Sequence, residues 1–332
     1  KDADGVFVAD TGSTDDSVAL LRDAGAHVSQ VCVRPWRFDH ARNASLFLVP
    51  SDFDVCIKLD IDERMDPGWR NAIESVWKKG KTTRLHYDFN MSPTNRYRAS
   101  WIHARHGYEW RWPIHEFLAS TEKEYTIEVA MGLSTTHLQE AGKESRGNYL
   151  NMLQRYSKTD TSSRMLYYLG REYSSVQKHK ECIATLEKYL KHEEATWTSE
   201  RMSACMMIAE SHINLKDRGQ YESWMLRAHH EEPWAREPLT ELAYNLYWNG
   251  QPALALGLAQ KAMKITHRQG HTFHTTRAWD ETTYSIAFIS AHDLGLKEEA
   301  AKYMRKALEI NPNSAYLKEN ARFVLPAHEI PV

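Results

Sequence analysis

The sequence has few cysteines, no long apolar run and almost no net charge. Its four cysteines are Cys32, Cys56, Cys182 and Cys205; none forms a CxxC pair, which argues against a zinc ribbon and against a dense disulfide framework. No apolar stretch approaches the roughly 20 residues that a membrane-spanning helix needs. The 42 Lys and Arg residues nearly balance the 44 Asp and Glu residues, and the resulting net charge of −2 argues against a globally basic nucleic-acid binder.

No signal peptide is recognisable, and together with the sparse cysteines this predicts a reducing, cytoplasmic setting. The composition, with 42% hydrophobic and 26% charged residues, is typical of a soluble globular protein. At roughly 150 residues per domain, the length predicts two domains. The chain begins at Lys1 and enters a strand-like run, Val6-Phe7-Val8, almost at once, so we expect that an upstream segment is missing.

Residues 1–145 alternate short β-rich runs with helical stretches, which is the pattern of an α/β domain. This alternation predicts a mostly parallel sheet with helices on both faces. In such sheets ligands bind at the carboxyl ends of strands, so we look for candidate residues there. The expected strands are 6–9, 27–33, 54–59, 82–89, 97–104 and 125–130, and the expected helices are 15–24, 39–49 and 67–79.

Residues 146–327 show helical periodicity and almost no strand pattern. One template recurs four times, with small residues where two helices must approach closely and large apolar residues between them. It resembles the tetratricopeptide repeat, an antiparallel helix pair of about 34 residues, and so implies an all-α repeat domain. Helix pairs without a repeat register are the alternative. Corresponding residues of the four copies are Gly170 and Leu186, Ala209 and Met225, Ala243 and Ala259, and Phe288 and Met304.

The spacing between the third and fourth copies is longer and predicts an inserted loop over 268–278. His267, His271 and His274 lie in or beside this loop. Three histidines suit a metal cluster, but we expect a solvated loop.

The strongest local pattern is the acidic segment 58–63, Lys-Leu-Asp-Ile-Asp-Glu, which follows an apolar strand. Side chains alternate in extended chain, so Asp60 and Asp62 are predicted to share one face. Two carboxylates at a strand end suit Mg²⁺ or Mn²⁺ that is also held by substrate phosphates. A polar strand end followed by a turn is the alternative.

Two further segments join strands to helices. In the first, Asp10 ends a strand, Gly12 permits a tight turn, and Ser13 lies before the next helix, whose free N–H groups suit an anion. An acidic residue at this strand tip can accept hydrogen bonds from a base or ribose. In the second, the segment 38–43 begins a helix, and its Arg42 and Asn43 are predicted to contact a nucleotide or to orient the neighbouring loop. A plain capped connection and surface polar residues are the respective alternatives.

Taken in order, the segments DTGSTDDS (10–17), FDHARNAS (38–45) and LDIDE (59–63) resemble the family 2 type glycosyltransferases with the GT-A fold, a Rossmann-like α/β fold. The resemblance continues through WPIHE (112–116), THL (136–138), Lys143 and RGN (146–148). A GT-A domain followed by tetratricopeptide-like repeats resembles a bacterial subgroup that includes peptide S-glycosyltransferases. Such enzymes normally begin with a strand that contacts the nucleotide base. Lys1 comes after that point, so we expect either that an upstream segment with this strand is missing or that the strand was never present.

The resemblance implies roles for particular residues. Asp62 is the expected direct metal ligand, Asp60 is expected to contact the ribose or sugar or to bind metal through water, and His137 is the expected further metal or diphosphate ligand. Glu116 is the expected general base, with Glu109 as its rival and Glu63 as a supporting group. The donor-binding residues implied are Asp10, Gly12, Ser13, Arg42, Asn43, Asp60 and His115.

The predicted function is a glycosyltransferase that depends on Mn²⁺ or Mg²⁺ and moves a hexose from a UDP-sugar, with inversion, to a peptide, protein or glycan. The repeats are expected to hold the acceptor or a second copy of the chain. One alternative is a non-catalytic repeat scaffold with a degenerate transferase domain. The other is a nucleic-acid glycosyltransferase, for which the near-neutral charge gives no support; the small basic cluster Lys78, Lys79, Lys81 and Arg84 is most simply a solvated helix end.

Overall fold

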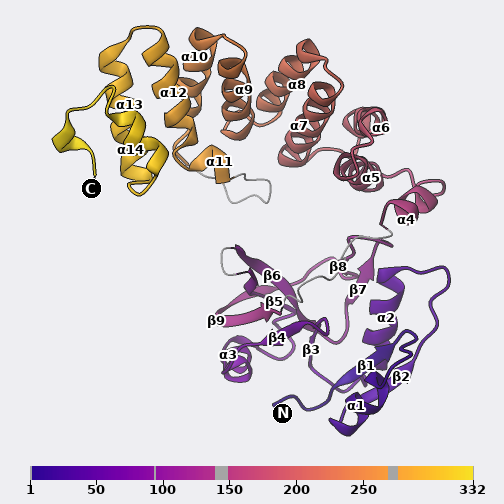
Figure 1. The fold of residues 1–332 in the computed structure, drawn as a ribbon. Helices are drawn as coiled ribbons and strands as arrows, with labels where there is room; N and C mark the ends of the chain where they lie inside the picture. The colour runs from indigo at the N-terminus through magenta and orange to yellow at the C-terminus, as the bar shows by residue number, and fades with distance from the viewer. Residues whose placement is uncertain (1, 93–94, 139–148, 268–275, 332) are drawn as a thin grey trace. The chain divides into compact units, whose positions relative to one another are not determined.

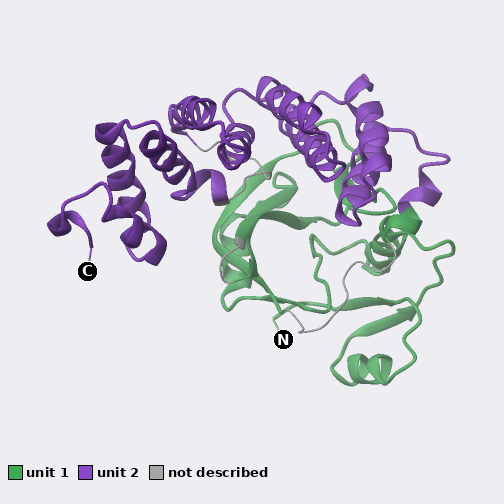
Figure 2. Ribbon diagram, turned by 45° about the horizontal axis from the view of Figure 1, so that its top comes forward, with its two compact units in different colours: residues 1–152 green, residues 153–332 purple. Residues whose placement is uncertain are grey.

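A computed structural model describes residues 2–92, 95–138, 149–267 and 276–331 of the protein. The chain divides into two compact units, Lys1–Met152 and Leu153–Val332 (Figure 2). The predicted domain boundary after residue 145 lies outside the described residues. No helix in the described part of the chain is long and apolar enough to cross a membrane.

The first unit contains short strands and four helices in its described ranges (Figure 1). In chain order these elements are β1 (Phe7–Asp10), α1 (Ser17–Asp23), β2 (His27–Gln30), α2 (Phe38–Leu48), β3 (Val55–Ile57), β4 (Glu63–Met65), α3 (Trp69–Val76), β5 (Arg84–Ser92), β6 (Asn95–Ala104), β7 (Tyr108–Arg111), β8 (Phe117–Ser120), β9 (Ile127–His137) and α4 (Tyr149–Tyr156), the last of which runs across the division between the units.

The described strands form three sheets rather than one mostly parallel sheet. β1 and β2 pair in parallel, β7 and β8 pair antiparallel, and the five-stranded sheet has the order β3-β6-β5-β9-β4. In that largest sheet only β5 and β9 pair in parallel. The prediction of a mostly parallel sheet is therefore wrong. No helix separates β5 from β6 or β7 from β8, and strands joined directly pair antiparallel.

The core of the five-stranded sheet follows the alternation of side chains along its strands. Leu85, Tyr87 and Phe89 of β5 are almost fully buried, as are Ile102 of β6 and Leu133 of β9. Successive side chains of a strand point to opposite faces, so these alternate residues cover one face. The first unit is thus a mixed α/β unit, and its identity as a GT-A domain stays a prediction.

The second unit is helical, with successive helix pairs side by side (Figure 1). Its elements are α5 (Ser163–Ser175), α6 (His179–Lys191), α7 (Thr198–Asn214), α8 (Arg218–Glu231), α9 (Glu237–Trp248), α10 (Pro252–Met263), α11 (Thr276–Trp279), α12 (Thr282–Asp293), α13 (Lys297–Ile310), α14 (Ala315–Ala321) and a 3₁₀ turn at Ala327–Glu329. The prediction of an all-α repeat region is confirmed.

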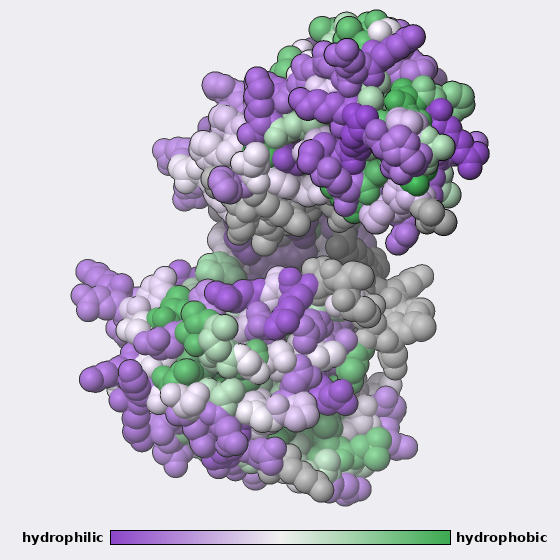
Figure 3. Space-filling view, turned by 90° about the vertical axis from the view of Figure 1, so that its left-hand side faces the viewer, coloured by the Kyte–Doolittle hydropathy of each residue, from purple (hydrophilic) through white to green (hydrophobic). Residues whose placement is uncertain are grey.

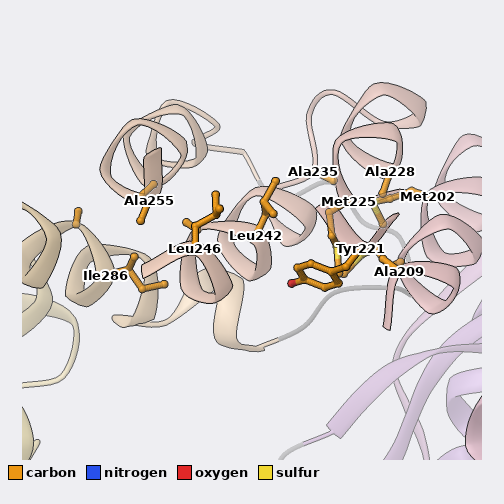
Figure 4. Close-up of a cluster of buried hydrophobic side chains, with 14 of the residues drawn as sticks. Met202, Ala209, Tyr221, Met225, Ala228, Ala235, Leu242, Leu246, Ala255 and Ile286 are labelled. Atoms are coloured by element: carbon orange, nitrogen blue, oxygen red, sulfur yellow. The ribbon is translucent and has the colours of Figure 1, made fainter. Parts of the chain in front are cut away.

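One continuous apolar core runs through these helix pairs, and Figure 4 shows part of it from Met202 to Ile286. The small residues of the repeat template lie at the helix contacts: Gly170, Ala209 and Ala243 are all buried. Small side chains let neighbouring helices approach closely, so the spacing of these residues sets the stacking. Outside the core, hydrophilic residues cover much of the face in Figure 3, with smaller hydrophobic areas between them.

Gly170 and Gly257 give a matched test of this packing. A Cβ at Gly170 would lie 2.3 Å from Cδ2 of the fully buried Leu186, whereas a Cβ at Gly257 meets nothing within 4 Å. We expect Gly170→Ala to destabilise the protein, because overpacking costs about 1–3 kcal/mol. Gly257→Ala should instead stabilise by about 1 kcal/mol, the helix-propensity difference between alanine and glycine. Urea unfolding of both variants measures this, and equal effects would contradict the packing argument.

Candidate functional site

The acidic segment after β3 is a turn rather than extended chain. The N–H of Glu63 donates to the carbonyl oxygen of Asp60 at 2.9 Å, and β4 begins at Glu63. The nearly buried carboxylate of Glu63 accepts from the N–H of Asp60 at 2.9 Å and from the Lys58 ammonium at 3.4 Å. The extended arrangement assumed for Asp60 and Asp62 is therefore wrong, because the Glu63 side chain stabilises a reversal there. Both carboxylates remain accessible, with 41% and 27% of their side chains exposed.

Arg42 of α2 connects this turn to a second carboxylate. Its guanidinium lies 2.9 Å from Asp60 and also donates to Glu116, and it stacks 5.1 Å from the centre of the Trp110 ring. Arg42 thus contacts two other predicted site residues, Asp60 and Glu116. The three residues come from α2, from the turn after β3 and from the segment before β8.

Lys58, for which no role was predicted, also pairs with Asp60. Its ammonium lies 2.8 Å from Asp60 and 4.3 Å from the centre of the Trp101 ring. Burial acts to raise the pKa of Asp60, but Lys58 and Arg42 together outweigh it and lower that pKa to about 2. Asp60 is therefore ionised at neutral pH. A cation two residues before the acid was the available sequence signal.

Asp62 and His137 form a second pair at the same turn. Oδ2 of Asp62 lies 3.5 Å from Nε2 of His137, because β4 and β9 pair with Glu63 opposite His137. The backbone N–H of Leu138 donates to the carbonyl oxygen of Asp62 at 2.7 Å, which fixes this alignment. Nδ1 of His137 is buried and has no hydrogen-bond partner.

This arrangement can be compared with the needs of a divalent cation. Carboxylate oxygen and neutral imidazole are both suitable metal ligands. Both oxygens of Asp60 already accept hydrogen bonds from Arg42 and Lys58, whereas the other two predicted ligands, Asp62 and His137, face each other. In the described ranges no three His, Cys, Asp or Glu side chains form a metal-binding group. The remaining ligands would have to come from a bound diphosphate and water.

Asp10 lies at the carboxyl end of β1, as predicted. Its Oδ1 accepts from the N–H of Ser13 at 3.1 Å across a turn in which Gly12 has φ +118°. Hydrogen bonds from Ser13 lower the pKa of Asp10. Its other oxygen, Oδ2, is buried and has no partner. A buried carboxylate oxygen without a donor is costly, so it is well suited to accept from a bound ligand.

The other predicted residues differ in what they contact. The Asn43 side chain exchanges two hydrogen bonds, at 2.7 and 2.8 Å, with the backbone of Trp110 and so joins α2 to β7. His115 packs its ring edge-to-face 5.7 Å from Tyr149. The two candidate bases have different partners. Glu109 is paired with Arg111 at the surface, whereas Glu116 contacts Arg42.

Some residues singled out in the sequence lie outside the described part of the chain. Lys143 and residues 146–148 of the family resemblance lie outside the described residues, as do His271 and His274 of the inserted loop. His267 is described and exposed.

Comparison with known proteins identifies the repeat. The tetratricopeptide repeat family matches residues 284–314, which include most of α12 and α13. The sequence thus contains a tetratricopeptide repeat. No curated protein matches the chain.

Similar solved structures include one reported as "Crystal structure of MamA", with 18% identity, 50% of this chain and 89% of that chain covered, and a TM-score of 0.41. A TPR repeat-containing protein from Cytophaga hutchinsonii has 14% identity, 53% and 63% coverage, and a TM-score of 0.43. YrrB, described as a TPR protein with an unusual peptide-binding site, has 18% identity, 52% and 81% coverage, and a TM-score of 0.39.

The charge balance at Asp60 leads to a pH prediction. Because the folded pKa of about 2 lies below the ordinary value of 3.8, the stability that Asp60 contributes is fully present above pH 3.8 and is lost as the pH falls through about 2. Carboxyl NMR titration of the full chain should give that low midpoint. In Arg42→Gln the midpoint should rise, because burial then opposes Lys58 alone. An unshifted midpoint in the variant would show that Arg42 does not control Asp60.

Proposed function

We propose that the second unit is a protein-binding module. The tetratricopeptide repeat at 284–314 and the stack of helix pairs around one core support this. Each pair in such a stack contacts only its neighbours, and the array presents an extended surface to a partner. The observation that carries the proposal is that large aromatic side chains remain on the surface of a unit whose core is complete without them; Trp248, for example, is 64% exposed.

A displayed library of random peptides tests this proposal with the full chain. We expect enrichment of related peptide sequences that compete with one another for binding. Asp62→Ala, a change in the first unit, should leave that binding unaltered and serves as the control. Absence of any enriched sequence, on protein that melts cooperatively, would contradict a peptide-binding role.

The second candidate function is sugar transfer by the first unit. The observation that favours it is the buried, unpartnered oxygen of Asp10, which lies at a strand tip where a nucleotide base or ribose can donate a hydrogen bond. In this proposal Asp62 and His137 hold Mn²⁺ or Mg²⁺. The bound ion would offset negative charge on a departing nucleoside diphosphate.

The other residues of the site have distinct roles in this candidate function. Arg42 holds Asp60 in place beside the turn, and Asp60 accepts from the hydroxyl groups of the ribose or sugar. Arg42 also fixes Oε1 of Glu116, so that Oε2 is left to take the proton from the acceptor nucleophile. Direct displacement would invert the anomeric centre. A peptide or protein acceptor, cytoplasmic location and a homodimer formed through the repeats remain predictions alongside it.

Thermal melting with a panel of nucleotide sugars and Mn²⁺ tests the transfer proposal. A ligand that binds only the native state must raise the melting temperature, and at 100 times its Kd it adds about 2.7 kcal/mol. We expect a rise with UDP-sugars for the natural chain. Asp62→Ala should remove the part of this rise in melting temperature that depends on Mn²⁺, and it should abolish sugar transfer. It should not lower the melting temperature of the free protein.

Asp54→Asn is the matched control for that experiment, because it removes a half-exposed carboxylate paired with Lys79 elsewhere in the same unit. It should leave both the shift and the transfer intact. No shift with any donor for the natural chain would leave the repeat module as the function of the protein.

A further inference from the structure

Three exposed aromatic side chains form a surface on the second unit. It comprises Tyr244 and Trp248 of α9 and Tyr316 of α14, which are 37%, 64% and 51% exposed; we refer to these three residues as the α9 aromatic face. The ring centres of Tyr244 and Trp248 lie 6.1 Å apart. Desolvation raises the pKa of Tyr316, and the phenol of Tyr244 raises it further. Adjacent exposed aromatic side chains are typical of a binding surface.

The protein itself places a guanidinium on this face. Arg277 of α11 lies 3.8 Å from the centre of the Tyr244 ring, and its Nη1 lies 3.4 Å from Oε2 of Glu241. A cation held between an aromatic ring and a carboxylate gains from both interactions. The surface is therefore chemically suited to basic side chains.

The carboxylates around the face outnumber this cation. Asp280 acts electrostatically on Glu241, with Arg277 as the opposing charge, and Glu241 in turn acts on Glu210 of α7. Glu210 is exposed as a residue, and desolvation of its carboxylate, followed by the Glu241 charge, raises its pKa. Beside Trp248, the Tyr247 hydroxyl donates to Asp293 at 2.9 Å. A further positive charge is favoured near these groups.

We propose that the α9 aromatic face binds an arginine- or lysine-bearing segment of a partner protein, an inference that rests on the protein-binding role proposed for this unit. The aliphatic part of such a side chain would cover Trp248 and Tyr316. Its charged end would then lie among the carboxylates, as the guanidinium of Arg277 already does beside Glu241. Charge complementarity, rather than apolar area alone, selects a basic segment.

The test uses the peptide library and the full chain, followed by binding measurements on an enriched peptide. We expect arginine or lysine at a fixed position of the enriched sequences. Trp248→Ala should weaken binding about tenfold, the size expected for a partly desolvated cation–π contact. Glu241→Gln should also weaken binding, and the affinity of this variant should depend less on salt concentration than that of the natural chain. Leu254→Ala, which removes an exposed apolar side chain of α10, is the control and should have no effect.

Each other outcome has a definite meaning. Enriched peptides without a basic position, or binding that is unchanged in Trp248→Ala, would overturn this inference and leave the protein-binding role standing. No enrichment at all would contradict the protein-binding role and the inference together. Binding of a glycan array that is lost in Trp248→Ala, without peptide enrichment, would assign the aromatic face to sugar and overturn the proposal. Melting temperatures equal to that of the natural chain establish that the variants are folded.

Discussion

The guanidinium of Arg42 is the contact on which the candidate site of the first unit depends. It lies on α2 and reaches the carboxylates of Asp60 and Glu116 as well as the ring of Trp110. Asp60 lies between β3 and β4 of the five-stranded sheet, whereas Trp110 lies in β7 and Glu116 just before β8, the two strands of another sheet. Removing one member of a partly buried ion pair leaves the other without compensation, which is far more costly than losing an exposed pair. The positions of the two carboxylates are therefore linked through one side chain.

The two units are stabilised by different kinds of contact. The first unit brings charged side chains together from distant segments, and each needs a partner of opposite charge. The second unit is held by apolar packing repeated along the chain, with small residues such as Ala209 and Ala243 at the helix contacts. Its surface residues are therefore free to vary without loss of the core. The exposed aromatic side chains of that unit lie outside its core, and this is why a binding role is proposed for them.

The sequence predicted the helical unit well because its determinants are local. Small residues recurring in register identify helix pairs that contact only their neighbours, and the helices formed where the periodicity placed them. At β1, Asp10 and Gly12 also predicted the local turn, since the hydrogen bond from Ser13 spans only three residues.

The first unit was harder to predict because its decisive contacts are not local. Strand order depends on which strands pair, and the strand–helix alternation of the first half did not reveal the antiparallel pairing of β5 with β6. The segment around Asp60 looked extended, yet the Glu63 side chain binds the Asp60 N–H and reverses the chain. Lys58 was missed because its importance comes from Asp60 and Trp101 together, and Trp101 is distant in sequence.

Hydrogen exchange of the full-length chain with Arg42→Gln, compared with the natural chain, tests the central claim most directly. If Arg42 holds the site together, exchange should accelerate at the backbone N–H groups of Asp60 and Trp110. The first donates to the carboxylate of Glu63, and the second donates to the side chain of Asn43 on α2. Protection in α7 and α12 of the second unit should not change. Natural exchange rates at Asp60 and Trp110 in the variant would show that the three segments are held by other contacts and would contradict the account.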